Sequence, residues 1–345
     1  MKIGIVGANG YGGVELIRYL VNHPYVEIKL LASHSSNGNS IVEQYPHLQG
    51  ILEMNISELN IEDVKENIDV LFFATPSGVS KELIPQYIEA GIKIIDLSGD
   101  LRLQDGSLYE GWYKNTPAPP FALDKAIYGL TELNRELIKE ATLVANPGCY
   151  PTATLLGLIP ALQHKLIDGN SIVIDGKSGI SGAGRKTSAT THYSEINENV
   201  KAYKLGKHQH IPEIEQIVSQ IGNENITVTF STHLVPMTRG IMCTMYANLK
   251  EPINESKVIS LYEDYYKDDY FVRIRKGGTW PATKEVTGSN FCDIGITVDE
   301  RTNKLIIVAV IDNVVKGAAG QAIQNLNVMY GWDEKTGLQT TPLFP

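Results

Sequence analysis

The chain opens on a short apolar strand pattern, Lys2–Val6, that runs directly into a glycine-rich turn. Glycines stand at every third position from Gly7 to Gly13, Gly12 is a further one, and the amphipathic run Val14–Leu20 follows. Glycine lets a backbone turn tightly and approach a pyrophosphate, and the helix that follows offers N–H donors to it. This order predicts a parallel α/β sheet that binds a dinucleotide at the carboxyl ends of its strands.

Strand and helix patterns alternate through the first part of the chain, which predicts a mostly parallel sheet with helices on both faces. We expect strands at Lys2–Val6, Val26–Ala32, Val70–Ala74, Lys93–Asp96 and Leu143–Ala145, and helices at Val14–Asn22, Ser80–Ala90 and Asn134–Lys139. From Ser171 onward apolar and polar residues alternate over longer runs, as in an antiparallel sheet with one covered face. These runs are Ser171–Asp175, Ile226–Leu234, Ile241–Leu249, Phe291–Val298 and Lys304–Ile311.

The tail that begins at Asp312 is rich in small residues and has a helical pattern, so we expect it to return to the first domain. The sequence therefore predicts an α/β fold with two domains. Residues 1–147 plus 314–345 form a Rossmann-type dinucleotide-binding domain. Residues 148–313 form an α+β catalytic domain with a mainly antiparallel sheet.

Charge and cysteine content argue against several classes of protein. Lys and Arg number 30 against 39 Asp and Glu, and the resulting net charge of −9 repels nucleic acid and anionic lipid. Cys149, Cys243 and Cys292 include no C-x-x-C pair, which argues against a disulfide framework and a structural zinc site. No leader follows Met1, and no apolar run approaches the ~20 residues of a membrane span. We expect a cytoplasmic protein that holds no metal and acts on a small molecule.

The cofactor is expected to contact the glycine-rich turn and the end of the second strand. In the turn the candidates are Gly7, Asn9, Gly10, Tyr11 and Gly12. An NAD site usually carries an acid at the end of the second strand, for the ribose 2′-hydroxyl. Here the strand ends in Ala32, and hydroxyls at Ser33, Ser35 and Ser36 follow. This favours NADP, whose 2′-phosphate an acid would repel. The alternative is a glycine-rich turn that binds nothing.

Cys149 is the candidate nucleophile. It follows the apolar run Thr142–Ala145 and the turn Asn146–Gly148, and it begins a helical pattern. Unpaired N–H groups at a helix start favour thiolate over thiol. Cys243 and Cys292 lie inside alternating strand patterns, where a cysteine is more often a small buried apolar residue.

A thiolate that attacks an acyl group needs an acid/base partner, and histidine suits neutral pH. His208 and His210 precede a helix that starts at Pro212. We favour one of them, although a polar loop with incidental histidines, or part of a metal site without a third ligand, gives the same pattern. His192 and His233 are weaker candidates.

Three segments predict a pocket for anions. Arg102 follows the strand Lys93–Asp96, and Arg239 follows another strand in the second half. The loop Lys177–Lys186 is rich in glycine and contains Ser181, Gly182 and Arg185. Such loops bind phosphate through backbone N–H groups, and guanidinium groups bind carboxylate or phosphate. Together they suggest a substrate with two anionic groups.

Several of these segments, which span essentially the whole chain, resemble the N-acetyl-γ-glutamyl-phosphate reductase family, a relative of the aspartate-semialdehyde dehydrogenases. The matching stretches are Gly7–Gly13, Asn146–Ala153, Ser178–Arg185, His208–Gln216, His233–Gly240 and Val315–Ala322. The resemblance implies NADPH-dependent reductive dephosphorylation through a Cys149 thioester, in arginine biosynthesis, with His210 favoured over His208 as acid/base. It also implies that Asn313 and Lys316 approach the cofactor and that the enzyme is a homo-oligomer, a dimer or tetramer. Ser181 and Gly182 are further candidate cofactor contacts.

The roles of the arginines stay open at this point. We expect Arg102 to hold the departing phosphate and either Arg185 or Arg239 to bind the α-carboxylate of the substrate. The segment Thr283–Asn290 also matches the family, but no chemistry is assigned to it. The alternative functions are another acyl-phosphate-reducing semialdehyde dehydrogenase, such as one for aspartyl phosphate, and a dinucleotide-binding protein without catalysis.

Overall fold

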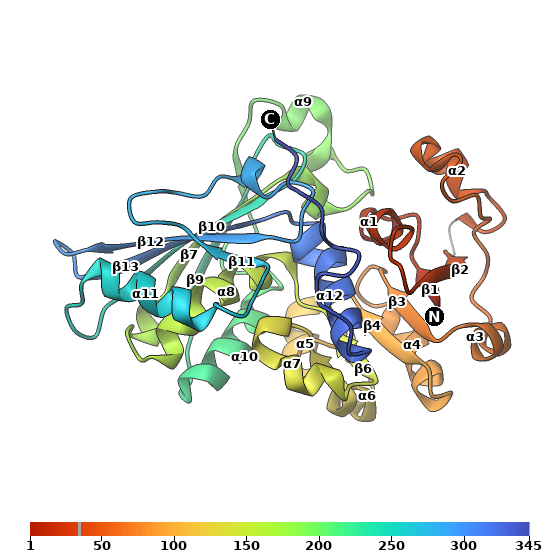
Figure 1. Ribbon diagram of the computed structural model, residues 1–345, viewed down its shortest axis with the longest axis horizontal. Coiled ribbons are helices and arrows are strands. Elements are labelled where there is room, and N and C mark those ends of the chain that lie inside the picture. The colour runs from red at the N-terminus through yellow and green to blue at the C-terminus, as the bar shows by residue number, and fades with distance from the viewer. Residues whose placement is uncertain (34–35, 345) are drawn as a thin grey trace. The chain divides into compact units, whose positions relative to one another are not determined.

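The structure is a computed structural model that describes residues 1–33 and 36–344, and it divides into two compact units (Figure 1). The first unit consists of Met1–Gly148 and Ala318–Gln339, and the second of Cys149–Gly317 and the residues from Thr340 onward. Compared with the expected domain boundaries, Gly148 groups with the first unit, and residues 314–317 and 340–344 group with the second. Among the described residues, none of the helices has the length and apolar character that crossing a bilayer requires.

The first unit is built on a six-stranded sheet in the order β2-β1-β3-β4-β6-β5. Every pairing in it is parallel. The strands are β1 (Lys2–Val6), β2 (Glu27–Ala32), β3 (Val70–Phe73), β4 (Lys93–Asp96), β5 (Ile127–Tyr128) and β6 (Leu143–Ala145). All four residues of β3 are fully buried, as expected for a parallel strand covered on both faces. The predicted dinucleotide-binding fold is confirmed, and β5 is the strand that the sequence pattern missed.

Helices connect and cover these strands. They are α1 (Tyr11–Leu20), α2 (Ile41–Gln44), α3 (Ile61–Asn67), α4 (Ser80–Glu89), α5 (Gly106–Tyr113), α6 (Pro120–Lys125), α7 (Thr131–Lys139) and α12 (Gly320–Met329). Helix α12 comes from the end of the chain and packs against α1, α7 and β4. Two buried amide side chains of α12 also form hydrogen bonds to the loop before α7. Gln321 and Asn325 both donate to the Gly129 carbonyl, at 3.1 and 2.8 Å. Helix α12 thus groups with the first unit of the chain.

The second unit is built on a seven-stranded sheet in the order β11-β12-β13-β10-β7-β9-β8. The strands are β7 (Val173–Ser178), β8 (Lys201–Tyr203), β9 (Thr229–Leu234), β10 (Ile241–Asn248), β11 (Val272–Ile274), β12 (Cys292–Asp299) and β13 (Lys304–Ile311). The pairs β7–β9 and β11–β12 are parallel, and the other four are antiparallel. The sheet is therefore mainly antiparallel, as predicted. The short strands β8 and β11 gave no readable pattern.

One face of this sheet is covered by α8 (Cys149–Gln163), which is buried from Tyr150 to Leu162. Gly157 permits the close approach, because a β-carbon there would lie 2.5 Å from the Met245 Cε atom. Helix α10 (Ile211–Gly222) packs on α8, and α9 (Tyr193–Ile196) and α11 (Glu255–Tyr265) complete the α-helices of the unit within the described ranges. On β10 the alternate side chains, such as Met242 and Tyr246, stay partly exposed on the other face. We refer to this face, which is partly exposed in the described part of the chain, as the open face of the sheet.

Candidate active site

The glycine-rich turn adopts the geometry that its spacing predicts. Gly7 has a positive φ of +86°, and a β-carbon on it would lie 2.4 Å from the Ala74 carbonyl oxygen. A β-carbon on Gly13 would lie 2.3 Å from the Gly7 carbonyl oxygen. At Gly10 and Gly12 a β-carbon would meet only ordinary contacts, at 3.5 and 3.7 Å. Gly7 and Gly13 are thus required by the packing of β1, β3 and α1 on one another.

Asn9 brings the turn and the end of β2 together. Its amide nitrogen donates to the Ser36 hydroxyl at 2.9 Å, and its amide oxygen accepts from the Ser33 hydroxyl at 2.9 Å. The Tyr45 hydroxyl donates to the Asn9 carbonyl, also at 2.9 Å. Three of the predicted cofactor residues therefore form one cluster, while Ser35 lies outside the described residues. Tyr11, at the start of α1, is 39% exposed.

Two observations fit a bound dinucleotide. The N-cap of α1 is Gly10, which makes no side-chain cap hydrogen bond, so the helix start is suited to an external anion. The Thr75 hydroxyl, directly after β3, is buried without a hydrogen-bond partner in the structure. An orphaned hydroxyl at the carboxyl end of a strand is typical of a ligand contact. The sequence analysis missed Thr75, although its position after β3 was a signal.

In the second unit, Cys149 is the first residue of α8 and is partly buried. Gly317, in the π-helical turn Val315–Ala319, lies directly against it, since a β-carbon on Gly317 would stand 2.7 Å from the Cys149 Cβ atom. Cys243 and Cys292 are fully buried free thiols, as predicted. Burial raises the pKa of Cys243 to about 12, which keeps it protonated and unreactive.

The two candidate histidines pack around Tyr150, the residue after Cys149. The ring centroids of His208 and His210 lie 5.6 and 6.1 Å from that of Tyr150, and 4.7 Å from each other. Tyr203 and Phe230 complete the cage around His208, at 5.6 and 5.7 Å. Both histidines are buried, with 5% and 8% of their surface exposed. The structure therefore brings both imidazoles to the start of α8.

The two histidines differ in their surroundings. Burial, helped by the charge of Lys204, lowers the pKa of His208 to about 4. The Nδ1 atom of His208 accepts the backbone N–H of His210 at 3.1 Å, which places the ring proton on Nε2. His208 is therefore neutral at physiological pH, and its orientation is fixed by the same backbone that carries His210.

Two tyrosines belong to the same cluster and were missed by the sequence analysis. The Tyr203 hydroxyl donates to that of Tyr150 at 3.4 Å. Burial raises the pKa of Tyr203 to about 12, and the nearby Cys149 contributes in the same direction. Tyr203 lies on the three-residue strand β8, which is too short to show a sequence pattern that would have predicted it. Among the weaker candidates, His233 instead pairs with Asp175, at 3.2 Å.

The predicted anion-binding arginines have three different settings. Arg102 is buried, and its Nε and Nη2 atoms donate to the main-chain carbonyls of Asn146 and Leu97 at 2.8 and 2.7 Å. It thereby ties the end of β4 to the turn after β6. Arg185 is exposed on the loop that follows the short helical turn Ile180–Ala183. Arg239 is about one-third exposed, and its Nη1 atom lies 3.5 Å from a carboxylate oxygen of the fully buried Asp312.

The remaining predicted cofactor residues are Asn313 and Lys316, which follow β13, and Ser181 and Gly182, which lie in the short helical turn Ile180–Ala183. Asn313 donates to the Ser181 hydroxyl at 2.9 Å and accepts the backbone N–H of Gly240 at 2.7 Å. Gly182, next to Ser181, is exposed. Lys316 is fully buried, and its ammonium lies 5.7 Å from the centre of the Phe271 ring, within the range of a cation–π contact.

Comparison with known proteins agrees with this arrangement. Residues 2–141 match the family model "Semialdehyde dehydrogenase, NAD binding domain", and residues 149–313 match "Semialdehyde dehydrogenase, dimerisation domain". Among solved structures, aspartate semialdehyde dehydrogenase II from Vibrio cholerae superposes with a TM-score of 0.73 at 19% identity, covering 96% of this chain and 98% of that one. The aspartate semialdehyde dehydrogenase with NADP from Candida albicans gives 0.67 at 17% identity, covering 95% and 98%. These structures share the fold.

Closer relatives carry one name. N-acetyl-gamma-glutamyl-phosphate reductase from Bacillus subtilis (strain 168) is 54% identical over 345 residues, covering 100% of both chains. The reductase of the same name from Oceanobacillus iheyensis is 55% identical and covers 100% of this chain and 99% of its own. The cysteine and histidine segments that carried the resemblance therefore lie within a full-length match. The chain belongs to the N-acetyl-γ-glutamyl-phosphate reductase family of oxidoreductases.

Proposed function

We propose that this chain reduces N-acetyl-γ-glutamyl phosphate to N-acetylglutamate semialdehyde and inorganic phosphate in arginine biosynthesis, with NADPH as reductant. The observation that carries the proposal is the position of Cys149 at the start of the buried helix α8, beside two buried imidazoles. A thiolate there has the N–H groups of the first helical turn next to it, and these stabilise both its own charge and an oxyanion formed by its attack.

The chemistry proceeds in two stages on Cys149. Its thiolate attacks the γ-acyl carbon, the tetrahedral oxyanion collapses, and phosphate leaves a thioester behind. NADPH, when bound, supplies the hydride that reduces this thioester. His210 donates a proton to the carbonyl oxygen as hydride arrives, and it takes the proton back as the aldehyde departs and the thiolate is regenerated.

We assign the proton transfer to His210 and a positioning role to His208. A pKa of about 4 keeps His208 a neutral imidazole at neutral pH, without the acidic proton of an imidazolium, and its Nδ1 atom accepts the His210 backbone N–H. Replacing His210 with Gln is expected to lower kcat by at least about a hundredfold. His208→Asn keeps an acceptor for that N–H and should cost less. If His208→Asn lowered kcat more than His210→Gln, the two roles would have to be exchanged.

For the cofactor we propose contacts from the first unit and from the second. Gly7, Gly10, Gly12 and Tyr11 would surround the pyrophosphate at the start of α1, and the Asn9 cluster with Ser33 and Ser36 would receive the 2′-phosphate. In the second unit Ser181, Gly182, Asn313 and Lys316 remain proposed contacts. On this proposal residues 1–147 with the returning tail are the nucleotide domain, and residues 148–313 are the catalytic domain.

For the substrate we propose that Arg239 binds the α-carboxylate. Its side chain is partly exposed, and its guanidinium group contacts the buried carboxylate of Asp312. The exposed Arg185 is the alternative for this carboxylate. Arg102 stays our candidate for the leaving phosphate. We further propose that the enzyme is cytoplasmic and that two copies associate through the open face of the second sheet, where Met242 and Tyr246 are partly exposed.

The experiment that tests the function is phosphate-dependent oxidation of semialdehydes by the purified chain, with NADP and with NAD. We expect N-acetylglutamate semialdehyde to be oxidised at least about a hundredfold more efficiently than aspartate semialdehyde, measured as kcat/KM. Equal or reversed preference would contradict the substrate. Cys149→Ser should abolish turnover while NADP binding, followed by fluorescence titration, is retained. A wild-type protein that binds NADP but turns over neither aldehyde would instead be a binding protein without catalysis.

A further inference from the structure

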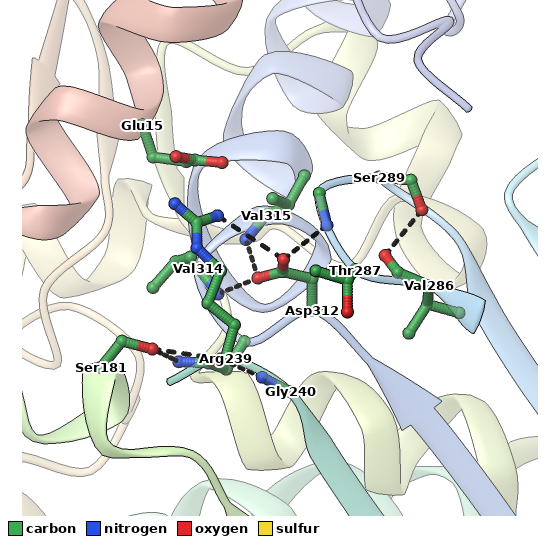
Figure 2. Close-up of polar contacts among 12 residues, drawn as sticks. Glu15, Ser181, Arg239, Gly240, Val286, Thr287, Ser289, Asp312, Val314 and Val315 are labelled. Atoms are coloured by element: carbon green, nitrogen blue, oxygen red, sulfur yellow. Dashed lines mark hydrogen bonds and ion pairs between the residues drawn. The ribbon is translucent and has the colours of Figure 1, made fainter. Parts of the chain in front are cut away.

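Two adjacent buried polar residues, Asp312 and Asn313, follow β13, and their side chains accept hydrogen bonds from the backbone of neighbouring loops. Figure 2 shows Asp312 with its partners Val314, Val315 and Arg239. Asp312 is fully buried. One of its carboxylate oxygens accepts the backbone N–H groups of Val314 and Val315 at 3.0 and 3.3 Å. The other accepts the Gly288 N–H at 2.8 Å. A buried carboxylate with several donors has a fixed orientation, because moving it would leave charge and donors unsatisfied.

Arg239 is the charged side chain that meets this fixed carboxylate. Its Nη1 atom lies 3.5 Å from the oxygen that also accepts the Gly288 N–H. The backbone beside the arginine is held as well, since Asn313 accepts the Gly240 N–H at 2.7 Å. Gly240 has a φ of +114°, and a β-carbon on it would lie 2.9 Å from the Thr283 Cβ atom. Both the side chain and the main chain at this point are therefore constrained.

These contacts also explain the segment Thr283–Asn290, to which the sequence analysis assigned no chemistry. Thr283 packs against Gly240, and Gly288 donates its N–H to Asp312. Within the segment, Ser289 donates to the Val286 carbonyl at 2.8 Å, as Figure 2 shows. The segment therefore contacts both the backbone next to Arg239 and the carboxylate that Arg239 meets.

We propose that Asp312 is the positioning residue for Arg239, which it aims at the substrate carboxylate. This inference rests on the proposed role of Arg239. A guanidinium binds a carboxylate best through two parallel hydrogen bonds, so its orientation decides how well it binds. An arginine whose orientation is already fixed by a buried carboxylate loses less conformational freedom when substrate arrives. Asp312 itself does not touch substrate.

The test separates substrate binding from cofactor binding and from turnover. Asp312→Asn keeps an oxygen for Val314 and Val315 but turns an NH₂ group toward the Gly288 N–H and Arg239. We expect the KM for the acyl phosphate to rise by about tenfold or more, with kcat and the KM for NADPH changed less than about twofold. A merely structural role would raise both KM values together. If the Asn variant does not fold, Asp312→Ser, whose hydroxyl still accepts from Val314, carries the same expectation.

Asp293→Asn is the matched control. Asp293 is also fully buried, lies on the neighbouring strand β12 and pairs with Arg273 and Arg275, both at 2.5 Å. Arg273 in turn donates to the Glu285 carbonyl, so this variant loosens the segment Thr283–Asn290 while the direct contact between Asp312 and Arg239 stays in place. We expect a lower melting temperature and a KM for the acyl phosphate that changes by less than about twofold. An increase equal to that of Asp312→Asn would overturn the inference.

Arg239→Gln distinguishes the inference from the function on which it rests. If this variant leaves the KM for the acyl phosphate unchanged, Arg239 does not bind substrate, and its proposed role fails. If the KM rises, Asp312→Asn should add nothing further in the Arg239→Gln background, because the two act as one unit. Independent, multiplying effects of the two substitutions would show that Asp312 acts by another route.

Discussion

Gly317 packs closely against Cys149. A β-carbon added to Gly317 would lie 2.7 Å from the Cys149 Cβ atom and 3.1 Å from its Cα atom. The position of Cys149 therefore depends on the absence of a side chain at Gly317. Gly317 belongs to a π-helical turn, a conformation that is rare and concentrated at functional sites.

Gly317→Ala is accordingly expected to displace Cys149. The added methyl group should reduce kcat/KM by about a hundredfold, since such shifts of a reacting group are costly, while unfolding free energy falls by about 1–3 kcal/mol. Gly111→Ala is the control, because a β-carbon at this position of α5 would meet nothing within 4 Å. It should leave activity unchanged and raise stability by about 0.5–1 kcal/mol. Full activity of Gly317→Ala would mean that the thiol is not confined there.

The buried His208 predicts a dependence of stability on pH. Its pKa is about 4 in the folded protein against 6.5 for a free side chain, so between these values the unfolded chain binds the extra proton. Stability should therefore be complete above pH 6.5 and be lost progressively as the pH falls toward 4, by up to about 3 kcal/mol. Urea unfolding of the wild type and of His208→Asn, measured across this range, should show a shallower slope in the variant. Identical slopes would contradict a neutral His208.

A negative charge at position 36 should weaken the preference for NADPH over NADH. In Ser36→Asp the carboxylate can still accept the Asn9 amide hydrogen, so the local hydrogen bond survives while a 2′-phosphate is repelled. We expect the ratio of kcat/KM for NADPH over NADH to fall at least about tenfold. Ser36→Asn, which adds bulk without charge, is the control. If both variants change the ratio equally, charge is not the cause.

The glycines of the turn should differ in their tolerance of a methyl group. Gly13→Ala puts a β-carbon 2.3 Å from the Gly7 carbonyl oxygen and is expected to cost about 2–3 kcal/mol, because backbone must move. Gly12→Ala meets only the Ala74 side chain at 3.7 Å and should be neutral or slightly stabilising in α1. Thermal melting of the two variants checks the difference. A stable Gly13→Ala protein would show that α1 is not held as closely on β1 as the structure has it.

Much of the fold could be predicted because its main strands are long enough to show a pattern. The all-apolar β3 and the alternating β10 indicated a covered parallel strand and a strand with one covered face. Strands of two or three residues, such as β5 and β8, carry no periodicity, and β8 supplies Tyr203. Because β8 was not predicted from the sequence, Tyr203 was not recognised as part of the candidate site.

The candidate site was predictable where chemistry is local and not where it depends on distant partners. Cys149 at a helix start and the histidines before Pro212 follow from neighbouring residues. The lowered pKa of His208 arises from burial among Tyr150, Tyr203 and Phe230, which come from separate elements. Arg102 was placed at the edge of the sheet, but nothing near it in sequence indicates that it bonds the Asn146 carbonyl.

The first unit is discontinuous, and this has a consequence for synthesis. Helix α12 provides the amides that bind the Gly129 carbonyl and the Thr131 hydroxyl, yet the ribosome makes it only after the entire span Cys149–Gly317. During synthesis, the first unit therefore lacks the helix that packs against α1 and α7 until translation has passed Ala318. Its packing is completed only after the whole second segment has been made.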